Sequence, residues 1–79
     1  MTIQVLFFGA AASLIGERCM ERSFAYGATS RSVFDQIKAE YPSLGRHKLI
    51  FSVNQTYASG DEVVHDGDEI AIFTAVSGG

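Results

Sequence analysis

The stretch Asp66–Gly79 reads Asp-Gly-Asp-Glu-Ile-Ala-Ile-Phe-Thr-Ala-Val-Ser-Gly-Gly, and it decides the fold that we expect. Its first pair, Asp66-Gly67, predicts a tight turn, because Asp hydrogen-bonds its own backbone and Gly accepts a positive φ without steric cost. A strand is expected over residues 69–73, with apolar side chains on both faces: Ile70 and Ile72 on one, Ala71 and Phe73 on the other. Two apolar faces are typical of a strand inside a sheet rather than at its edge.

The residues that follow this strand predict a flexible tail, which we place at 73–79. Between Thr74 and Ser77 the chain carries too little apolar mass to anchor itself, and Gly78-Gly79 carries none. Two consecutive glycines end a chain by chance about once in a hundred cases at the usual glycine content. Because glycine has no Cβ, a diglycine end is thin enough to enter a narrow channel in another protein.

The candidate reactive group is then the terminal α-carboxylate, on Gly79. Such a group is ionised at neutral pH and is a poor acyl donor until it is activated, for example as an acyl-adenylate. Once activated, it can accept sulfur or join to an amine. The sequence shows no nucleophile with a neighbouring base and no phosphate-binding glycine loop, so the activating enzyme is expected to be another protein.

Outward from this stretch, the periodicity predicts a single α+β domain over residues 1–79. Strands are expected over residues 3–8, 19–26 and 49–54, with a further extended segment over 62–65. The main helix is expected over 31–40, capped by Thr29 or Ser30 and ended before Pro42. One turn of helix within 9–16 is expected to point Leu14 and Ile15 inward.

The composition limits the classes of function. With 79 residues the chain builds one small core and leaves little room for an active-site cavity, so a self-contained enzyme is not expected. A net charge of −3, with Arg46-His47-Lys48 as the longest basic run, disfavours nucleic acid as a partner. A single cysteine, Cys19, indicates a reducing, cytoplasmic compartment and is expected to be a small buried hydrophobe. The apolar run over 5–16 follows no Lys or Arg and is too short for a bilayer, so neither a signal peptide nor membrane association is expected.

Two groups of polar residues are weaker candidates for a site. His47 and His65 lie far apart, without a Cys or second His at ligand spacing, so no metal site is expected. An acidic cluster lies near the expected root of the tail, and it consists of Asp61, Glu62, Asp66, Asp68 and Glu69. Two interpretations of this cluster stay open: a set of turn residues on a solvated face, or a patch that steers the tail toward a basic partner.

Three aromatic side chains, Phe8, Tyr57 and Phe73, are candidates for a partner-binding surface. Each of them alone can be a core residue. Phe8 and Phe73, however, are expected to point to the face opposite their inward-facing neighbours Phe7 and Ile72. A single main helix covers only one face of a sheet, so apolar surface is expected to remain exposed on the other face.

Phrases along the whole chain resemble the small sulfur-carrier subunits of molybdopterin synthase. They are Val5-Leu6-Phe7-Phe8, Val53-Asn54-Gln55-Thr56, Asp66-Gly67-Asp68-Glu69-Ile70-Ala71 and Val76-Ser77-Gly78-Gly79. The resemblance implies a ubiquitin-like β-grasp fold, which is a mixed sheet with one main helix across one face and a flexible Gly-Gly tail. It also implies that the first and last strands pair in parallel.

The same resemblance implies the chemistry and the partners. An E1-like adenylating enzyme that consumes ATP would activate Gly79, which is then converted to a thiocarboxylate, with Gly78 as its slender neighbour. The tail would enter the large synthase subunit, where the sulfur goes to the pterin precursor, in a heterotetramer of two small and two large subunits. The chain itself is expected to bind no cofactor. The expected partner-binding residues are Phe8, Tyr57, Phe73, Val76 and Ser77.

Two departures from the family pattern leave the identity of the partner open. Ala12-Ser13-Leu14 stands where the family usually has Arg-Glu-Leu, which removes a charged contact, and Thr74-Ala75 replaces Pro-Pro, which loosens the tail. Three alternatives stay open beside the molybdopterin carrier. They are a sulfur carrier for thiamin or another metabolite, a ubiquitin-like modifier of lysines on target proteins, and a plain interaction module with an ordinary frayed end.

Overall fold

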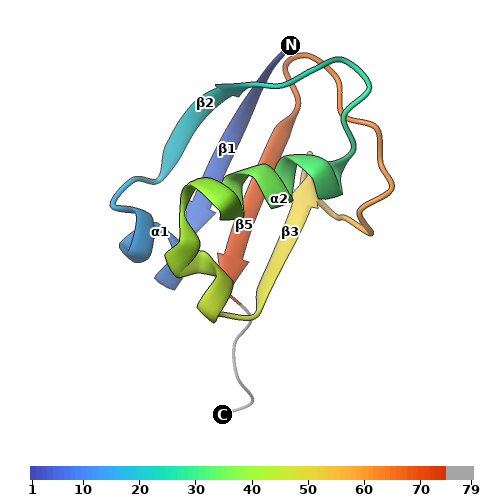
Figure 1. The fold of residues 1–79 in the computed structure, drawn as a ribbon. Coiled ribbons are helices and arrows are strands. Elements are labelled where there is room, and N and C mark those ends of the chain that lie inside the picture. The colour runs from blue at the N-terminus through green and yellow to red at the C-terminus, as the bar shows by residue number, and fades with distance from the viewer. Residues whose placement is uncertain (75–79) are drawn as a thin grey trace.

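The computed structural model describes residues 1–74, so the predictions for Val76, Ser77, Gly78 and Gly79 lie outside the described residues. Residues 1–74 contain a five-stranded mixed sheet with the order β2-β1-β5-β3-β4. Its strands are β1 (Thr2–Phe8), β2 (Cys19–Ser23), β3 (Leu49–Val53), β4 (Thr56–Tyr57) and β5 (Glu69–Thr74). The helix α2 (Ser30–Glu40) crosses one face of the sheet (Figure 1). The short helices α1 (Ala10–Ile15) and η1 (Pro42–Arg46) lie at the end of the sheet where β1 and β5 finish (Figure 1). The expected α+β, β-grasp architecture is confirmed.

The two central strands, β1 and β5, run parallel, as the resemblance implies. Their register runs from Gln4 opposite Glu69 to Phe8 opposite Phe73. On its other side β5 pairs antiparallel with β3, so it is hydrogen-bonded along both edges. The last strand of the sequence is therefore the centre of the sheet.

The turn before β5 is confirmed, but the strand is longer than predicted. Gly67 has a φ of 86°, and the N–H of Asp68 donates to the carbonyl of His65 at 3.0 Å, which closes the turn. The strand continues through Phe73 to Thr74. Phe73 lay in both the expected strand and the expected tail, and Thr74 lay in the tail. Both belong to the sheet, because Phe73 pairs with β1 and β3 and Thr74 pairs with β3.

The main helix begins with a reciprocal cap. The Thr29 hydroxyl accepts a hydrogen bond from the Ser32 N–H, and the Ser32 hydroxyl accepts one from the Thr29 N–H, at 3.2 and 3.0 Å. The Phe34 ring stacks on Phe51 of β3 at 4.4 Å between centroids, so α2 packs firmly on the sheet. No helix within residues 1–74 has the length and apolar character needed to cross a membrane. The fully buried large apolar side chains of the core are Ile3, Val5, Phe7, Val33, Ile37, Leu44, Val64, Ile70 and Ile72.

Three predictions near the first strand are wrong. Leu14 is 39% exposed, and Ala11 is buried in its place, because residues four apart share a helix face and Ala11 and Ile15 form the inner face of α1. Cys19 is exposed rather than buried, since it begins the edge strand β2 opposite Leu6, on the face that α2 does not cover. The predicted strand to residue 26 also ends earlier, at Ser23.

The segment after β3 forms a tight hairpin. Asn54 and Gln55 both have positive φ, 48° and 70°, which is the backbone of a two-residue turn that matches the twist of paired strands. The turn places β4 beside β3, with Tyr57 opposite Ser52. Tyr57 thereby comes onto the same sheet face as Phe73, whose strand β5 flanks β3 on its other side.

Candidate functional site

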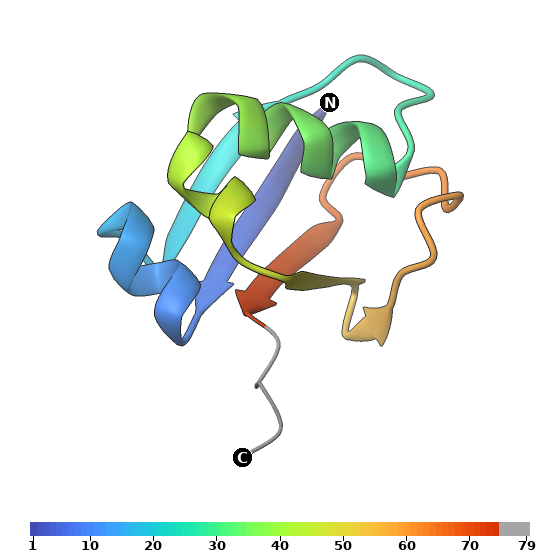
Figure 2. The same ribbon diagram turned by 60° about the horizontal axis from the view of Figure 1, so that its bottom comes forward.

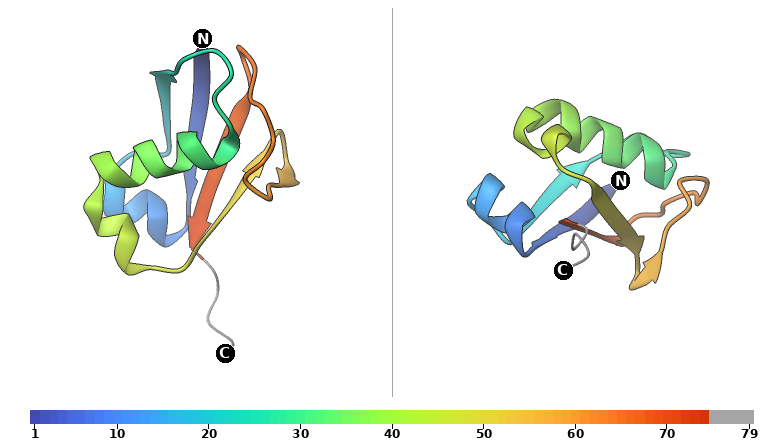
Figure 3. Two further views of the ribbon diagram at one scale, coloured as in Figure 1. Left: turned by 45° about the vertical axis from the view of Figure 1, so that its right-hand side comes forward. Right: turned by 90° about the horizontal axis from the view of Figure 1, so that it is seen from below.

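One face of the sheet is left open by the helices. α2 lies on the other face, and no helix of the described residues covers this one (Figures 2 and 3). Register places alternate residues of neighbouring strands in rows across the open face. We call the apolar part of this surface the open apolar face, and it consists of Leu6, Phe8, Ile50, Tyr57, Ala71 and Phe73.

The apolar residues gather at the end of the face where β5 finishes. The last row holds Phe8, Phe73 and Ile50, and the row before it holds Leu6 and Ala71. Toward the opposite end, the same positions become polar, beginning with Gln4 opposite Glu69. The open face is therefore most apolar beside the point from which residues 75–79 continue.

The structure brings the three predicted aromatic residues together on this face. Phe8 is 51% exposed and lies opposite the half-buried Phe73. Tyr57 is 74% exposed, and its ring lies 6.1 Å from that of Phe73 between centroids. Monomeric proteins rarely leave a contiguous aromatic surface in water, so this arrangement is typical of a binding surface.

The acidic cluster lies at the wrong end of the molecule to steer the tail. Asp66 and Asp68 precede β5 and Glu69 begins it, whereas the tail follows it, and a six-residue strand separates its two ends by about 20 Å. These side chains also have local roles: Asp66 Oδ1 accepts from the Thr2 N–H at 2.7 Å, and Asp68 accepts from the His65 N–H at 2.8 Å. Asp66 and Asp68 are turn residues, which favours the first of the two interpretations.

Glu62, from the same cluster, fastens the loop after β4 to the start of α2. Its carboxylate accepts from the N–H groups of Ser59 and Gly60 at 2.8 and 3.0 Å, and from the Ser30 hydroxyl at 2.7 Å. The Ser59 N–H and then the Ser30 hydroxyl are the largest causes that lower the pKa of Glu62 to about 2. The pKa of Asp68 is lowered as well, chiefly by the His65 N–H and then by the Asn54 amide.

Replacing Glu62 by Gln is expected to flatten the pH dependence of stability in acid. The native carboxyl titrates near pH 2, whereas the unfolded one keeps its ordinary pKa of 4.5, so the unfolded state takes up more protons between these values. The stability that Glu62 confers is full above the unfolded pKa and is lost as the pH falls toward 2. Urea unfolding midpoints at neutral pH and at about pH 3 measure this loss. A fall equal to that of the wild type in Glu62→Gln would contradict the assignment, although Asp68 leaves a smaller fall in place.

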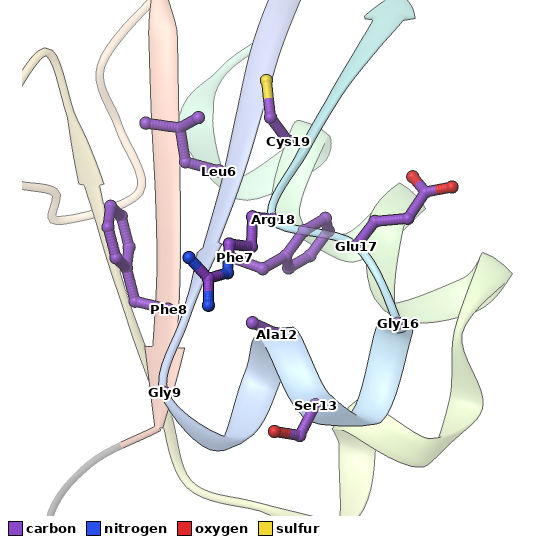
Figure 4. A pocket seen from close by; sticks show the side chains of 10 residues that line it. All are labelled: Leu6, Phe7, Phe8, Gly9, Ala12, Ser13, Gly16, Glu17, Arg18 and Cys19. Atoms are coloured by element: carbon purple, nitrogen blue, oxygen red, sulfur yellow. The ribbon is translucent and has the colours of Figure 1, made fainter.

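A groove that the sequence did not reveal adjoins the open apolar face. We call it the α1 groove; it has a volume of about 720 Å³ and lies between the end of β1, the helix α1 and the start of β2 (Figure 4). Gly9 and Gly16 bracket α1 with positive φ values of 59° and 83°, and the Gly16 N–H donates to the Ala12 carbonyl at 2.8 Å. Its lining residues are Leu6, Phe7, Phe8, Gly9, Ala12, Ser13, Gly16, Glu17, Arg18 and Cys19.

Groups that could hold a metal ion are not found among residues 1–74, where no three His, Cys, Asp or Glu side chains come together. His65 lies beside Asp68, with 3.8 Å between Nδ1 and Oδ2, and His47 follows η1 on the surface.

Known proteins match this chain over almost its whole length. The ThiS family matches residues 5–79. The molybdopterin synthase sulfur carrier subunit of Homo sapiens is 33% identical over 82 residues, which cover 98% of this chain and 93% of that protein.

Solved structures share the fold. Small archaeal modifier protein 1 of Haloferax volcanii superposes with a TM-score of 0.84 at 22% identity and covers 95% of this chain and 98% of its own. A chain from the Helicobacter pylori complex of subunits 1 and 2 of the molybdopterin-converting factor gives 0.68 at 24% identity, with full coverage of both chains. At these identities, the structural likeness shows the fold alone.

Proposed function

This chain belongs to the ThiS family, and from that premise we propose that it is the sulfur carrier subunit of a molybdopterin synthase. The observation that carries the proposal is the extent of the relationship. The family match reaches the last residue, Gly79, and the human carrier subunit aligns over 98% of the chain. The relationship therefore includes both the folded sheet and the terminus that would carry sulfur.

The carrier residue is Gly79, with Gly78 beside it. A partner adenylating enzyme joins the Gly79 carboxylate to AMP from ATP and releases pyrophosphate, and a sulfur donor then displaces AMP to leave a thiocarboxylate. The chain binds no cofactor of its own, and ATP is consumed by the partner. Alone it is not catalytic, and it acts in the cytoplasm.

The sheet supplies a rigid base for the reactive terminus. β5 is paired on both edges up to Phe73 and with β3 up to Thr74, and five further residues span at most about 17 Å when they are extended. Residues 75–79, with Val76 and Ser77 in contact with the partner, are long enough to bring Gly79 into an active site below a docked surface. The open apolar face, with Phe8, Tyr57 and Phe73, is the surface that docks on the large subunit. Two small and two large subunits form the complete synthase.

Reconstitution tests the proposal. The purified chain is first charged with the adenylating enzyme, ATP and a sulfur donor, and it is then mixed with the large subunit and the pterin precursor. Formation of molybdopterin in proportion to the charged carrier is the expected result. The same charged protein is offered to thiamin-forming enzymes, and sulfur transfer only there would replace the proposal by a thiamin carrier.

The modifier alternative is tested with the same preparation. Carriers and modifiers share this fold, so the likeness to an archaeal modifier protein does not separate them. A modifier forms amide bonds to lysines of target proteins, and such adducts survive treatment with thiols. Their absence from cells that make molybdopterin is the result that we expect.

A further inference from the structure

The charges of the described residues are separated along the strands. Three of the six Lys and Arg side chains have partners: Arg22 pairs with Glu40 at 3.0 Å, Lys38 with Asp35 at 3.6 Å, and Arg31 donates to the Ser59 carbonyl. The other three form no ion pair within residues 1–74, and they are Arg18, Arg46 and Lys48.

All three of these cations lie at the end of the sheet where β5 finishes. Arg18 precedes β2 and lines the α1 groove. Arg46 ends η1, and Lys48 comes directly before Leu49, the residue opposite Thr74. The turn with Asp66 and Asp68 lies at the other end, beside the first residues of β1 (Figure 1). A protein of net charge −3 thus presents its positive pole at the end that bears the open apolar face.

Arg18 is the cation best placed to meet a partner. Its guanidinium turns into the α1 groove, on the side of Phe8 and Ala12, whereas the carboxylate of Glu17 points away from the groove (Figure 4). Ala12 and Ser13 are small, which leaves the groove open to another side chain. Leu6 and Phe8 belong both to this groove and to the open apolar face, so the two surfaces are continuous.

We propose that the α1 groove receives an acidic side chain of the large synthase subunit, with Arg18 as its partner. The inference rests on the proposed function and adds to it the chemistry of the docking surface. A carboxylate in the groove meets a guanidinium that has no other ion pair within residues 1–74, beside an apolar surface that excludes water. Arg46 and Lys48 extend the positive field on the other side of Phe73 and speed the encounter.

Charge reversal tests the pairing. Arg18→Glu is expected to weaken binding to the large subunit at least about tenfold, and to make the remaining affinity less sensitive to salt, because it removes an attraction and adds a repulsion. Lys38→Glu is the control: it makes the same change of net charge on α2, on the covered face of the sheet. Titration calorimetry at low and high salt gives both values, and melting temperatures confirm that the variants are folded.

A chemical test locates the partner's group. Arg18→Lys retains the charge and introduces an amine that a carbodiimide couples only to a carboxylate in direct contact. We expect a cross-link from position 18 to one Asp or Glu of the large subunit, mapped by mass spectrometry. Coupling of Lys38 in the same sample is the internal control, and it is expected to stay within this chain.

The outcomes separate this inference from the proposed function. If the wild type binds the large subunit and Arg18→Glu binds equally well, the groove pairing is wrong and the carrier function stands. If Arg18→Glu loses binding only to the adenylating enzyme, the pairing with the large subunit is also wrong, because the acidic group then belongs to the adenylating enzyme. If the wild type does not bind the large subunit at all, the proposed function itself fails.

Discussion

A carrier extended by one alanine after Gly79 is expected to lose sulfur transfer by more than about a hundredfold, because misplacing a reacting group by even 1 Å has effects of this size. The added residue moves the terminal carboxylate by about 3.5 Å and gives it a neighbour with a Cβ. Thiocarboxylate formation and molybdopterin synthesis are both measured with the reconstituted enzymes.

The folded domain supplies the control for this variant. The added residue lies six positions beyond the last residue of β5, so the buried core is untouched and the melting temperature is expected to equal that of the wild type. A variant that melts normally and transfers nothing places the chemistry at the terminus. An extended protein that still transfers sulfur would show that the reactive group is elsewhere.

Ile72→Ala is expected to lower stability and Phe73→Ala to weaken binding to the large subunit, although the two residues are adjacent in β5. Ile72 is fully buried under α2, and removing its side chain from a packed core costs about 2–5 kcal/mol of unfolding free energy. Phe73 lies on the open apolar face beside Tyr57, and its removal is expected to cost about 2 kcal/mol or more of binding to the large subunit. Because Phe73 is half-buried, its effect on stability is expected to be the smaller one.

Two measurements on each variant distinguish these effects. Urea unfolding gives the stability, and calorimetric titration with the large subunit gives the affinity. Ile72→Ala is expected to bind normally once it is folded, and Phe73→Ala is expected to fold normally and bind poorly. Equal losses of stability in both variants, with no separate loss of binding, would make Phe73 a core residue and remove the open apolar face as the docking surface.

Local patterns in the sequence were sufficient for most of the fold. The cap at Thr29, the turn at Asp66-Gly67 and the alternation along β1 and β5 each depend on a few neighbouring residues, and the structure has them all. Which side of α1 faces the core was harder to predict. Its six residues include three alanines, so the sequence does not decide whether Leu14 or Ala11 is buried. The parallel pairing of β1 and β5 follows from no periodicity and came only from the resemblance.

The sequence left the role of the acidic cluster open because sequence proximity does not give distance in the fold. Asp66 and Asp68 are close to the tail in sequence, but the intervening strand carries the chain across the whole sheet, so they lie at the far end from Thr74. The gathering at one end of the sheet of the cations that form no ion pair within residues 1–74 depends on segments distant in the sequence, whereas the α1 groove is formed within residues 6–19. The one local signal for the groove was a pair of glycines, Gly9 and Gly16, around a run of small residues.

The intact mass of the protein, purified from cells that also contain an adenylating enzyme and a sulfur source, tests the carrier function most directly. We expect a species heavier by the exchange of one oxygen for one sulfur, with fragmentation locating the change at Gly79. Under conditions that convert an established carrier, a protein of unchanged mass would contradict it.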